Sequence, residues 1–210
     1  MKAIEKALDL FIPQPVCELQ FSNNFELLIA VILSAQCTDK RVNSVTKTLF
    51  QKYKTPKDFV ECGEENLAKE IYSLGFYRNK SKNIIKMCKD LIEKHNSKVP
   101  GTQEELTSLA GVGRKTANVV LSVGFNQNAF AVDTHVFRVS NRLGIVSTKS
   151  VTECEEKLKQ YFKGSNWSKI HLQLVNLGRY VCKARNPNCN ECHLKEYCKF
   201  FNQRRKNVSR

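Results

Sequence analysis

The fold of this 210-residue chain is decided by one stretch, residues 106–117, which reads LTSLAGVGRKTA. It places a glycine, a hydrophobic residue and a second glycine between two segments that have helical spacing of apolar residues. Gly111 and Gly113 permit positive φ and leave backbone N–H groups uncovered, and the small Ala117 lets two helices pack closely. A helix that starts after Gly113 adds the positive end of its dipole, so the stretch predicts a helical hairpin that binds an anion.

The remainder of the chain is also predicted to be helical. Apolar residues recur at helical spacing in three further sets: Phe25, Leu28, Ile29 and Ile32; Ile84, Ile85, Cys88, Leu91 and Ile92; and Ala117, Val120 and Leu121. Strand-like alternation is short and rare, and the five prolines fall between the helical segments. The pattern predicts an all-α protein without a long flexible linker.

The charge balance points to a polyanionic partner. The chain has 34 Lys and Arg against 20 Asp and Glu, a net charge of +14, which favours DNA or RNA. With Arg114 and Lys115 beside the glycines, the hairpin is expected to be a helix-hairpin-helix element that holds a DNA phosphate without reading sequence. The longest apolar run, residues 27–33, is too short to span a membrane. Acidic residues near the N-terminus argue against a secretion signal, so a cytoplasmic protein is expected.

The nine cysteines fall into two groups. Five are scattered, at positions 17, 37, 62, 88 and 154, and are expected to be small core residues. The other four are Cys182, Cys189, Cys192 and Cys198. Four thiolates from one short loop can enclose a metal centre. Only Cys189 and Cys192 have the pair spacing of a structural zinc site, so an iron–sulfur cluster fits at least as well and spacing leaves both open.

Two further residues are candidates for chemistry. Lys115 follows the hairpin, where a lysine is by itself more typical of a phosphate contact than of a nucleophile. Asp133 lies 18 residues onward, before Thr134, and Gly144 follows, which predicts a helix that starts after an N-cap aspartate and ends at the glycine. His135 is expected to be a surface or packing residue.

Several of these motifs together resemble the endonuclease III family, DNA base excision glycosylases of the helix-hairpin-helix superfamily. They are LAGVGRKTA at 109–117, VDTHVFR at 132–138 and the four-cysteine loop, joined by FELLIAVILSAQ at 25–36 and LGRY at 177–180. The resemblance covers nearly the whole chain, in the family's order. The cysteine spacing is that of the family's cluster, so the resemblance implies a [4Fe-4S] cofactor rather than zinc.

The resemblance also implies an architecture of two helical domains with a DNA-binding cleft between them. Residues 18–127 would form a six-helix barrel domain that contains the hairpin. Residues 1–17 and 128–210, from both chain ends, would form the iron–sulfur domain. Lys115 would lie on one wall of the cleft and Asp133 on the other.

The implied function is that of a bifunctional DNA glycosylase and abasic-site (AP) lyase in base excision repair. Lys115 would attack C1′ of a damaged nucleotide, expel the base and leave a Schiff base, after which β-elimination cuts the strand 3′ to the site. Asp133 would be its acidic partner. The expected partner is double-stranded DNA with oxidised or ring-saturated pyrimidines or abasic sites, bound by a monomer.

A third set of residues would contact DNA. A stacked base is inaccessible, so the nucleotide must rotate out, and by resemblance Gln36 and a wedge residue at Phe76 fill the gap. Gly111, Gly113 and Arg114 would hold a phosphate, and Lys183 and Arg185 would present charge from the cysteine loop. The sequence departs from the family at Phe76, where a smaller aliphatic residue is common, at Ala110 in place of proline, and at Cys37.

Two rival functions remain at this stage. A monofunctional mismatch glycosylase of the same superfamily is disfavoured by Lys115. A non-catalytic DNA-binding or redox-sensing module would use the hairpin and cluster only to hold DNA. Covalent trapping with borohydride separates both rivals from a lyase.

Overall fold

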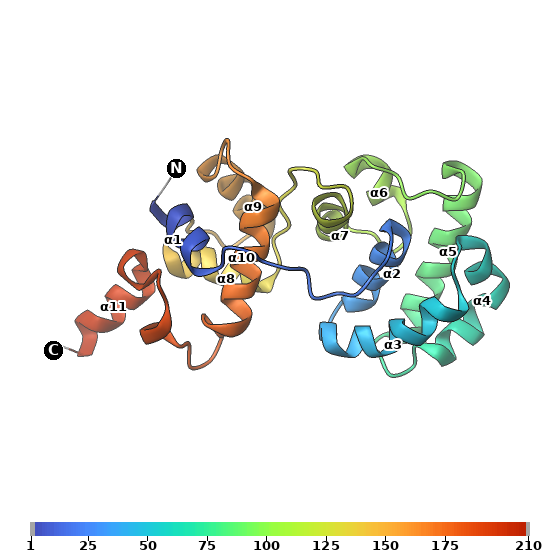
Figure 1. Cartoon of the computed structure of the whole chain (residues 1–210), viewed down its shortest axis with the longest axis horizontal. Coiled ribbons are helices and arrows are strands. Elements are labelled where there is room, and N and C mark those ends of the chain that lie inside the picture. Colours follow the sequence, from blue (N-terminus) through green and yellow to red (C-terminus); the bar gives the residue numbers. More distant parts are fainter. Residues whose placement is uncertain (1–2, 209–210) are drawn as a thin grey trace. The chain divides into compact units, whose positions relative to one another are not determined.

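The computed structural model describes residues 3–208, with side chains from residue 3 to Arg205. All regular secondary structure within these residues is helical, which confirms the all-α prediction (Figure 1). None of the described helices is both long enough and apolar enough to cross a membrane. The chain divides into two compact units, Cys17–Gln127 and a second made of Met1–Val16 with Asn128–Arg210. The predicted division had its first boundary one residue later.

The unit Cys17–Gln127 is built around a helix that is buried on every side. It contains α2 (Asn24–Ser34), α3 (Asp39–Lys52), α4 (Pro56–Glu70), α5 (Tyr77–His95), α6 (Gln103–Ser108), α7 (Arg114–Val119) and the π-helical turn η1 (Val120–Gly124). Every residue from Phe25 to Leu33 in α2 is buried, as expected for a central helix. Gly63, with φ of 77°, breaks α4 into two pieces. The periodic sets of the sequence lie in α2, α5 and α7 with η1, although Ile92 is exposed.

The second unit joins the two ends of the chain around its own core. It contains α1 (Ala3–Phe11), α8 (Thr134–Leu143), α9 (Val151–Tyr161), α10 (Trp167–Tyr180), the short turns η2 (Cys189–Glu191) and η3 (Lys195–Tyr197), and α11 (Lys199–Val208). Leu8 of α1 is fully buried with residues of α8, α9 and α10. Residues 1–2 and 209–210 of the predicted iron–sulfur domain lie outside the described residues.

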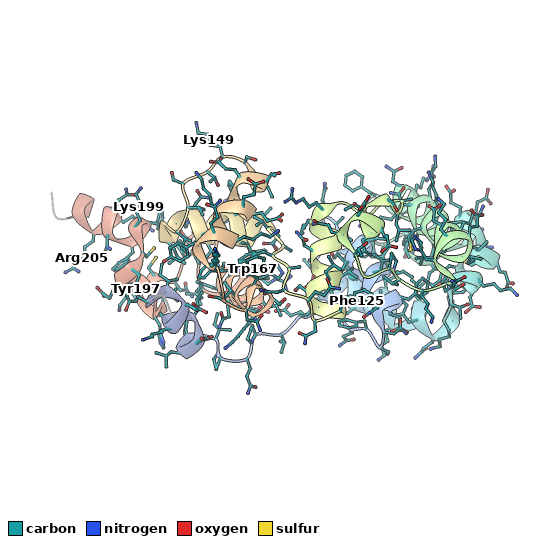
Figure 2. All side chains as sticks on the ribbon, turned by 90° about the horizontal axis from the view of Figure 1, so that it is seen from above. Phe125, Lys149, Trp167, Tyr197, Lys199 and Arg205 are labelled. Atoms are coloured by element: carbon teal, nitrogen blue, oxygen red, sulfur yellow. The ribbon has the colours of Figure 1, made fainter. Side chains whose placement is uncertain are left out.

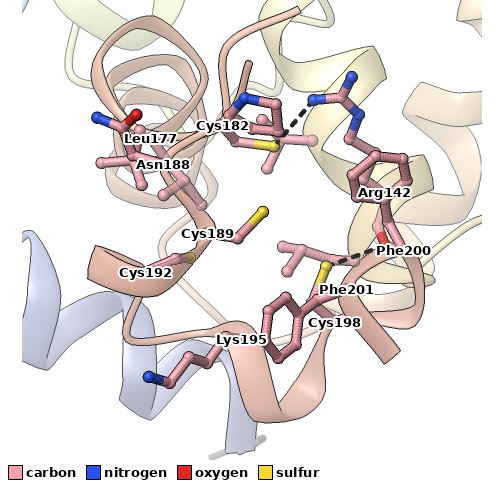
Figure 3. Close-up of a pocket in the computed structure, with 14 residues that line it drawn as sticks. Arg142, Leu177, Cys182, Asn188, Cys189, Cys192, Lys195, Cys198, Phe200 and Phe201 are labelled. Carbon is pink, nitrogen blue, oxygen red and sulfur yellow. Dashed lines mark hydrogen bonds between the residues drawn. The ribbon is translucent and has the colours of Figure 1, made fainter. Parts of the chain in front are cut away.

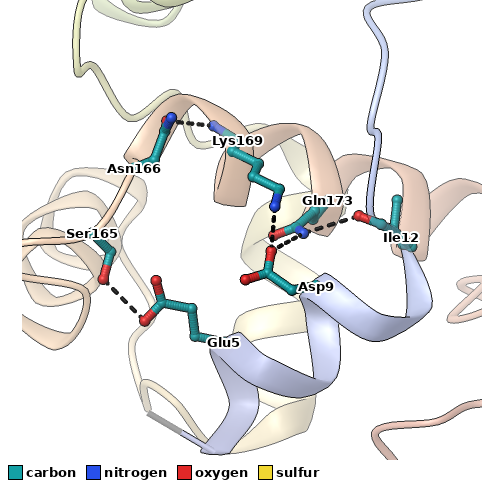
Figure 4. A network of polar contacts seen from close by, with 7 residues as sticks. All are labelled: Glu5, Asp9, Ile12, Ser165, Asn166, Lys169 and Gln173. Carbon is teal, nitrogen blue, oxygen red and sulfur yellow. Dashed lines mark hydrogen bonds and ion pairs between the residues drawn. The ribbon is translucent and has the colours of Figure 1, made fainter. Parts of the chain in front are cut away.

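A polar network fastens α1 to α10 in this unit. Asp9 accepts a hydrogen bond from Gln173 Nε2 at 2.9 Å and forms an ion pair with Lys169 at 2.6 Å (Figure 4). Gln173 Nε2 also donates to the carbonyl of Ile12 at 3.0 Å, which holds the chain just after α1 ends. The N-terminal segment is thereby tied to a helix that lies more than 150 residues away in sequence.

The expectation that all five scattered cysteines are core residues is wrong for three of them. Cys88 and Cys154 are fully buried, and burial raises the pKa of the Cys88 thiol to about 12. Cys17, Cys37 and Cys62 are only half-buried. The error has a physical reason: a small thiol tolerates a partly exposed position at a helix end or loop, so residue type alone does not fix its depth.

Candidate functional site

The predicted hairpin is present between α6 and α7. Leu109 and Val112 of the turn are buried, at 3% and 5% exposure, and the Val112 N–H donates to the Leu109 carbonyl at 3.1 Å. Gln103 Nε2 of α6 donates to Asn118 Oδ1 of α7 at 2.8 Å, and Asn118 is buried. The turn is therefore shaped by apolar burial and by a direct link between its two helices.

The two glycines of the hairpin have different surroundings. Gly111 has φ of 77°, and a Cβ there would lie 2.9 Å from Cβ of Asn83, so both backbone conformation and space require glycine. Gly113 is the N-cap of α7 with φ of −90°, and a Cβ there would meet nothing within 4 Å. The expectation of positive φ is correct for Gly111 and wrong for Gly113, whose absent side chain leaves open space.

Lys115 is the second residue of α7, and its side chain is exposed, as is that of Arg114. The buried Ala117 follows on the inner face of the same helix, where its N–H donates to the Gly113 carbonyl at 2.9 Å. The first turn of α7 is thus fixed in place, and the exposed amine of Lys115 on that turn is accessible to a large substrate.

Asp133 is the N-cap of α8, as predicted. Its Oδ1 accepts a hydrogen bond from the Val136 N–H at 2.8 Å, and the side chain is half-buried. The helix ends at Gly144, which has φ of 82° and is also the predicted stop. One carboxylate oxygen thus fixes the side chain to the helix, and the other oxygen is available for chemistry.

Two arginines of α8 hold the start of the cysteine loop. Arg138 donates to the carbonyls of Gly178 at 2.8 Å and Cys182 at 3.1 Å. Arg142 donates to the carbonyls of Lys183 at 2.7 Å and Ala184 at 2.9 Å, and to Cys182 Sγ at 3.5 Å. These contacts run from the helix that Asp133 caps to the loop that carries the cysteines.

The structure brings the four predicted ligand cysteines together. Cys182, Cys189, Cys192 and Cys198 line one cavity, whose other walls include Leu177, Phe200 and Phe201 (Figure 3). Burial raises the pKa of the Cys192 and Cys198 thiols, and charge on the neighbouring cysteines adds to the rise. Four thiols within electrostatic range around one apolar-walled space are the donor set of a thiolate-bound metal centre.

Within residues 3–205, where side chains are described, no group of three or more His, Cys, Asp or Glu is arranged to hold one metal ion. Zinc with bonds of about 2.3 Å needs its four sulfurs in a tight tetrahedron. In a [4Fe-4S] cluster each cysteine binds a different iron, so the sulfurs are spaced more widely. Both kinds of centre can be bound by four cysteine thiolates.

The two candidate gap-filling residues lie on exposed turns. Gln36 follows the end of α2 with φ of 56°, and Phe76 precedes α5 with φ of 58° and is 62% exposed. A left-handed backbone at a residue other than glycine or asparagine is uncommon and is often found at functional positions. Both side chains are therefore held out from the protein surface by an unusual backbone.

The candidate basic contacts also lie on the surface. Lys183 and Arg185 are exposed in the cysteine loop, where Arg142 holds the backbone between them. Lys199 and Arg205 project from α11 (Figure 2). Arg210, part of the predicted basic tail, lies outside the described residues.

Lys115 belongs to the unit Cys17–Gln127, and Asp133 belongs to the other unit. Their meeting in one cleft stays a prediction.

Sequence reasoning missed Asn83 and Asn118, which shape the hairpin, because nothing in the sequence marks a contact between distant segments. It also missed Arg138 and Arg142, although they are four residues apart in the helix that Asp133 caps and so lie on one face of it.

Comparison with known proteins identifies the family of this chain. Residues 29–163 match the HhH-GPD superfamily of base excision DNA repair proteins. Endonuclease III of Bacillus subtilis (strain 168) is 53% identical over 197 residues, which cover 93% of this chain and 90% of that protein. A solved structure of a trapped endonuclease III–DNA covalent intermediate has a TM-score of 0.91 at 49% identity, covering 96% of this chain and 97% of that one. A non-covalent endonuclease III–DNA complex has a TM-score of 0.91 at 48% identity, covering 96% and 94%. The chain therefore belongs to the endonuclease III family and is a base excision repair enzyme, a DNA glycosylase with AP lyase activity.

Proposed function

We propose that this enzyme excises oxidised or ring-saturated pyrimidines from double-stranded DNA, cleaves abasic sites, and uses Lys115 as its nucleophile. The observation that carries the proposal is the exposed Lys115 amine on the first turn of α7, directly after a hairpin whose shape is fixed by buried residues. Two solved relatives, one covalent and one non-covalent, are complexes with DNA.

The hairpin holds a DNA phosphate through its backbone. Gly113 has no internal need to be glycine, because its φ is ordinary and a Cβ would meet open space. A glycine that the protein itself does not require is understandable where a ligand approaches the backbone closely. Arg114 beside it adds positive charge, which contributes sequence-independent and salt-sensitive affinity.

Lys115 performs the covalent step. Its neutral amine attacks C1′, the bond from C1′ to the damaged base breaks, and the base leaves with the bonding electrons and takes up a proton. The amine loses its remaining proton as the sugar ring opens, which gives the Schiff base, and O4′ is protonated. A C2′ proton is then removed, the C3′–O bond breaks and the 3′ phosphate leaves, after which water releases Lys115.

Asp133 assists this chemistry from the N-cap of α8. One of its oxygens is held by the Val136 N–H, which orients the other. That oxygen accepts the proton from the attacking amine and stabilises positive charge on the sugar as the base leaves. The cap and the catalytic role are compatible because they use different oxygens.

Gln36 and Phe76 occupy the space that the rotated nucleotide leaves in the duplex. Unstacking a base costs a few kcal/mol, and side chains that enter the gap offset part of that cost. The exposed Phe76 ring can stack on the unpaired base opposite the lesion.

Cys182, Cys189, Cys192 and Cys198 hold a [4Fe-4S] cluster in the cavity that they line. When bound, the cluster cross-links the loop and leaves no thiolate free for other chemistry. Residues of this chain present the loop to DNA. Arg142 fixes the carbonyls of Lys183 and Ala184, so that the exposed Lys183 and Arg185 can contact a DNA backbone.

The test is borohydride trapping on duplex DNA that carries one abasic site. We expect a covalent protein–DNA adduct with the wild-type chain and none with Lys115→Ala. Lys149→Ala is the matched control, since it removes the same charge from another exposed lysine and should trap normally. An undiminished adduct with Lys115→Ala contradicts the proposal. Absence of any adduct from the wild-type chain supports the rival, a DNA-binding module without lyase chemistry.

A further inference from the structure

One lysine of this protein is placed unlike the others. Among the lysines whose side chains the structure describes, only Lys80 is buried, with 5% exposure. Its Nζ donates to the carbonyls of Leu33 and Ala35, each at 2.8 Å, and to Cys37 Sγ at 3.4 Å. None of the described carboxylates forms an ion pair with it. The contacts of this buried ammonium group are therefore two backbone carbonyls and one sulfur, in place of a carboxylate.

This arrangement has a clear physical basis. Burial of an unpaired ammonium group is costly, but the last carbonyls of a helix carry partial negative charge and have no partner within the helix. Leu33 is in the last turn of α2, and Ala35 lies just beyond its end at Ser34. Lys80 bridges the point where the helix breaks, and so fixes the direction in which the chain leaves α2.

The segment that Lys80 fixes is the turn that carries Gln36. That residue lies between two of the contacts, Ala35 and Cys37, and its φ is 56°. Two backbone bonds lie beside it: the Cys37 N–H donates to the Ser34 carbonyl at 3.0 Å, and the Ala35 N–H donates to the Ile32 carbonyl at 3.4 Å. The Gln36 turn thus depends on the Lys80 ammonium for much of its shape.

Lys80 also belongs to the first turn of α5, which begins directly after Phe76. Its backbone N–H donates to the Phe76 carbonyl at 3.0 Å. One residue therefore contacts both of the exposed turns: its side chain holds the Gln36 turn and its main chain closes the helical turn at Phe76.

We propose that Lys80 is a positioning residue, which sets the spacing and direction of Gln36 and Phe76 so that both enter the gap left by the rotated nucleotide. This inference rests on the proposed function of those two residues. It explains why a buried cation is kept at a site where an apolar side chain would cost less to bury. Lys80 itself touches neither DNA nor the reacting atoms in this role.

The test compares two substrates, of which only the first requires a nucleotide to be rotated out of a duplex. One is duplex DNA with thymine glycol, and the other is a single-stranded oligonucleotide with one abasic site, where no base has to be rotated out. The variant is Lys80→Met, which keeps most of the side-chain length and removes the charge. Cys37→Ala is the matched control, because it removes only the long contact to sulfur and leaves both carbonyl contacts.

For Lys80→Met we expect the single-turnover rate on the duplex to fall by about 10- to 100-fold, the size of effect that misplacement by about 1 Å produces. Strand cleavage and borohydride trapping on the single strand should stay at the wild-type level. Lys80→Arg, which keeps the charge, should recover part of the duplex rate, and Cys37→Ala should keep all of it. When the wild-type protein binds, 2-aminopurine placed opposite the lesion should change its fluorescence. This change should be absent with Lys80→Met.

Equal losses on both substrates, or no loss on either, would overturn the proposal. If thermal melting shows that Lys80→Met does not fold, Lys80→Gln, which keeps one donor, is measured in its place with the same expected division between substrates. Failure of the wild-type chain to trap the single-stranded abasic site would instead refute the role of Lys115. The two hypotheses are thus tested by different arms of the experiment.

Discussion

The hairpin around Lys115 and the cysteine loop after α10 are both candidate DNA contacts, but they are built in different ways. The hairpin turn has its own buried residues, Leu109 and Val112, and a glycine that its backbone requires. The cysteine loop contains only the turns η2 and η3, neither of which has a buried residue. The hairpin turn holds its own shape, whereas the cysteine loop, which buries Leu194 and Cys198, is held by Arg138 and Arg142 and would be cross-linked by the proposed cluster.

The largest effect is expected from Asp133→Asn, which tests whether α8 supplies chemistry in addition to support for the loop. Asparagine is as good an N-cap as aspartate, so the helix should remain intact. Loss of the carboxylate should slow base release by about 10²- to 10⁴-fold. Single-turnover excision and DNA affinity are the measurements. A normal excision rate would show that Asp133 is an N-cap and nothing more.

Removal of the cluster should affect only one of the two regions. Oxidation followed by chelation takes away the cross-links of the cysteine loop, so trypsin should cut rapidly at Lys183 and Arg185, while Arg114 and Lys115 stay protected by the packed hairpin. DNA affinity should fall by about tenfold or more, since exposed phosphate contacts are lost. Limited proteolysis with mass spectrometry reads both regions at once. Equal cleavage in the hairpin and in the cysteine loop would contradict the proposed difference between these two regions.

The same contrast explains what the sequence could predict. The hairpin and the start and stop of α8 were predicted correctly, and the four cysteines line one cavity, because each feature is encoded by neighbouring residues. Asn83 beside Gly111, Lys80 at the end of α2 and the arginines of α8 at the loop were not predicted, because each acts across many residues of sequence. The periodic apolar residues begin only at Ile84, so they show neither that Lys80 already lies in α5 nor what lies across from it.

The two hairpin glycines allow the proposed phosphate contact to be separated from folding. Gly111→Ala should destabilise the protein by about 1–3 kcal/mol, because alanine is strained at φ of 77° and its Cβ would be 2.9 Å from Asn83 Cβ. Gly113→Ala should leave the melting temperature unchanged and weaken DNA binding. Thermal melts and salt-dependent binding measure the two effects. If Gly113→Ala binds DNA normally, the open space at that glycine is not a phosphate site.

The smallest effect is expected at Asp9, which lies in neither region and so provides a baseline for both. The hydrogen bond from Lys169, with a smaller contribution from Gln173, holds the pKa of the Asp9 carboxyl below its ordinary value. A lowered folded-state pKa gives stability that is present above the unfolded pKa and is lost as the pH falls through the folded value. Asp9→Asn should therefore lower the free energy of unfolding at pH 7 by about 1 kcal/mol or less, because the pair is partly exposed. The difference between variant and wild type should shrink as the pH falls below about 4, with excision at pH 7 unchanged. A difference that is constant with pH would show that the contacts of Asp9 act through shape and hydrogen bonding, without a contribution from its charge.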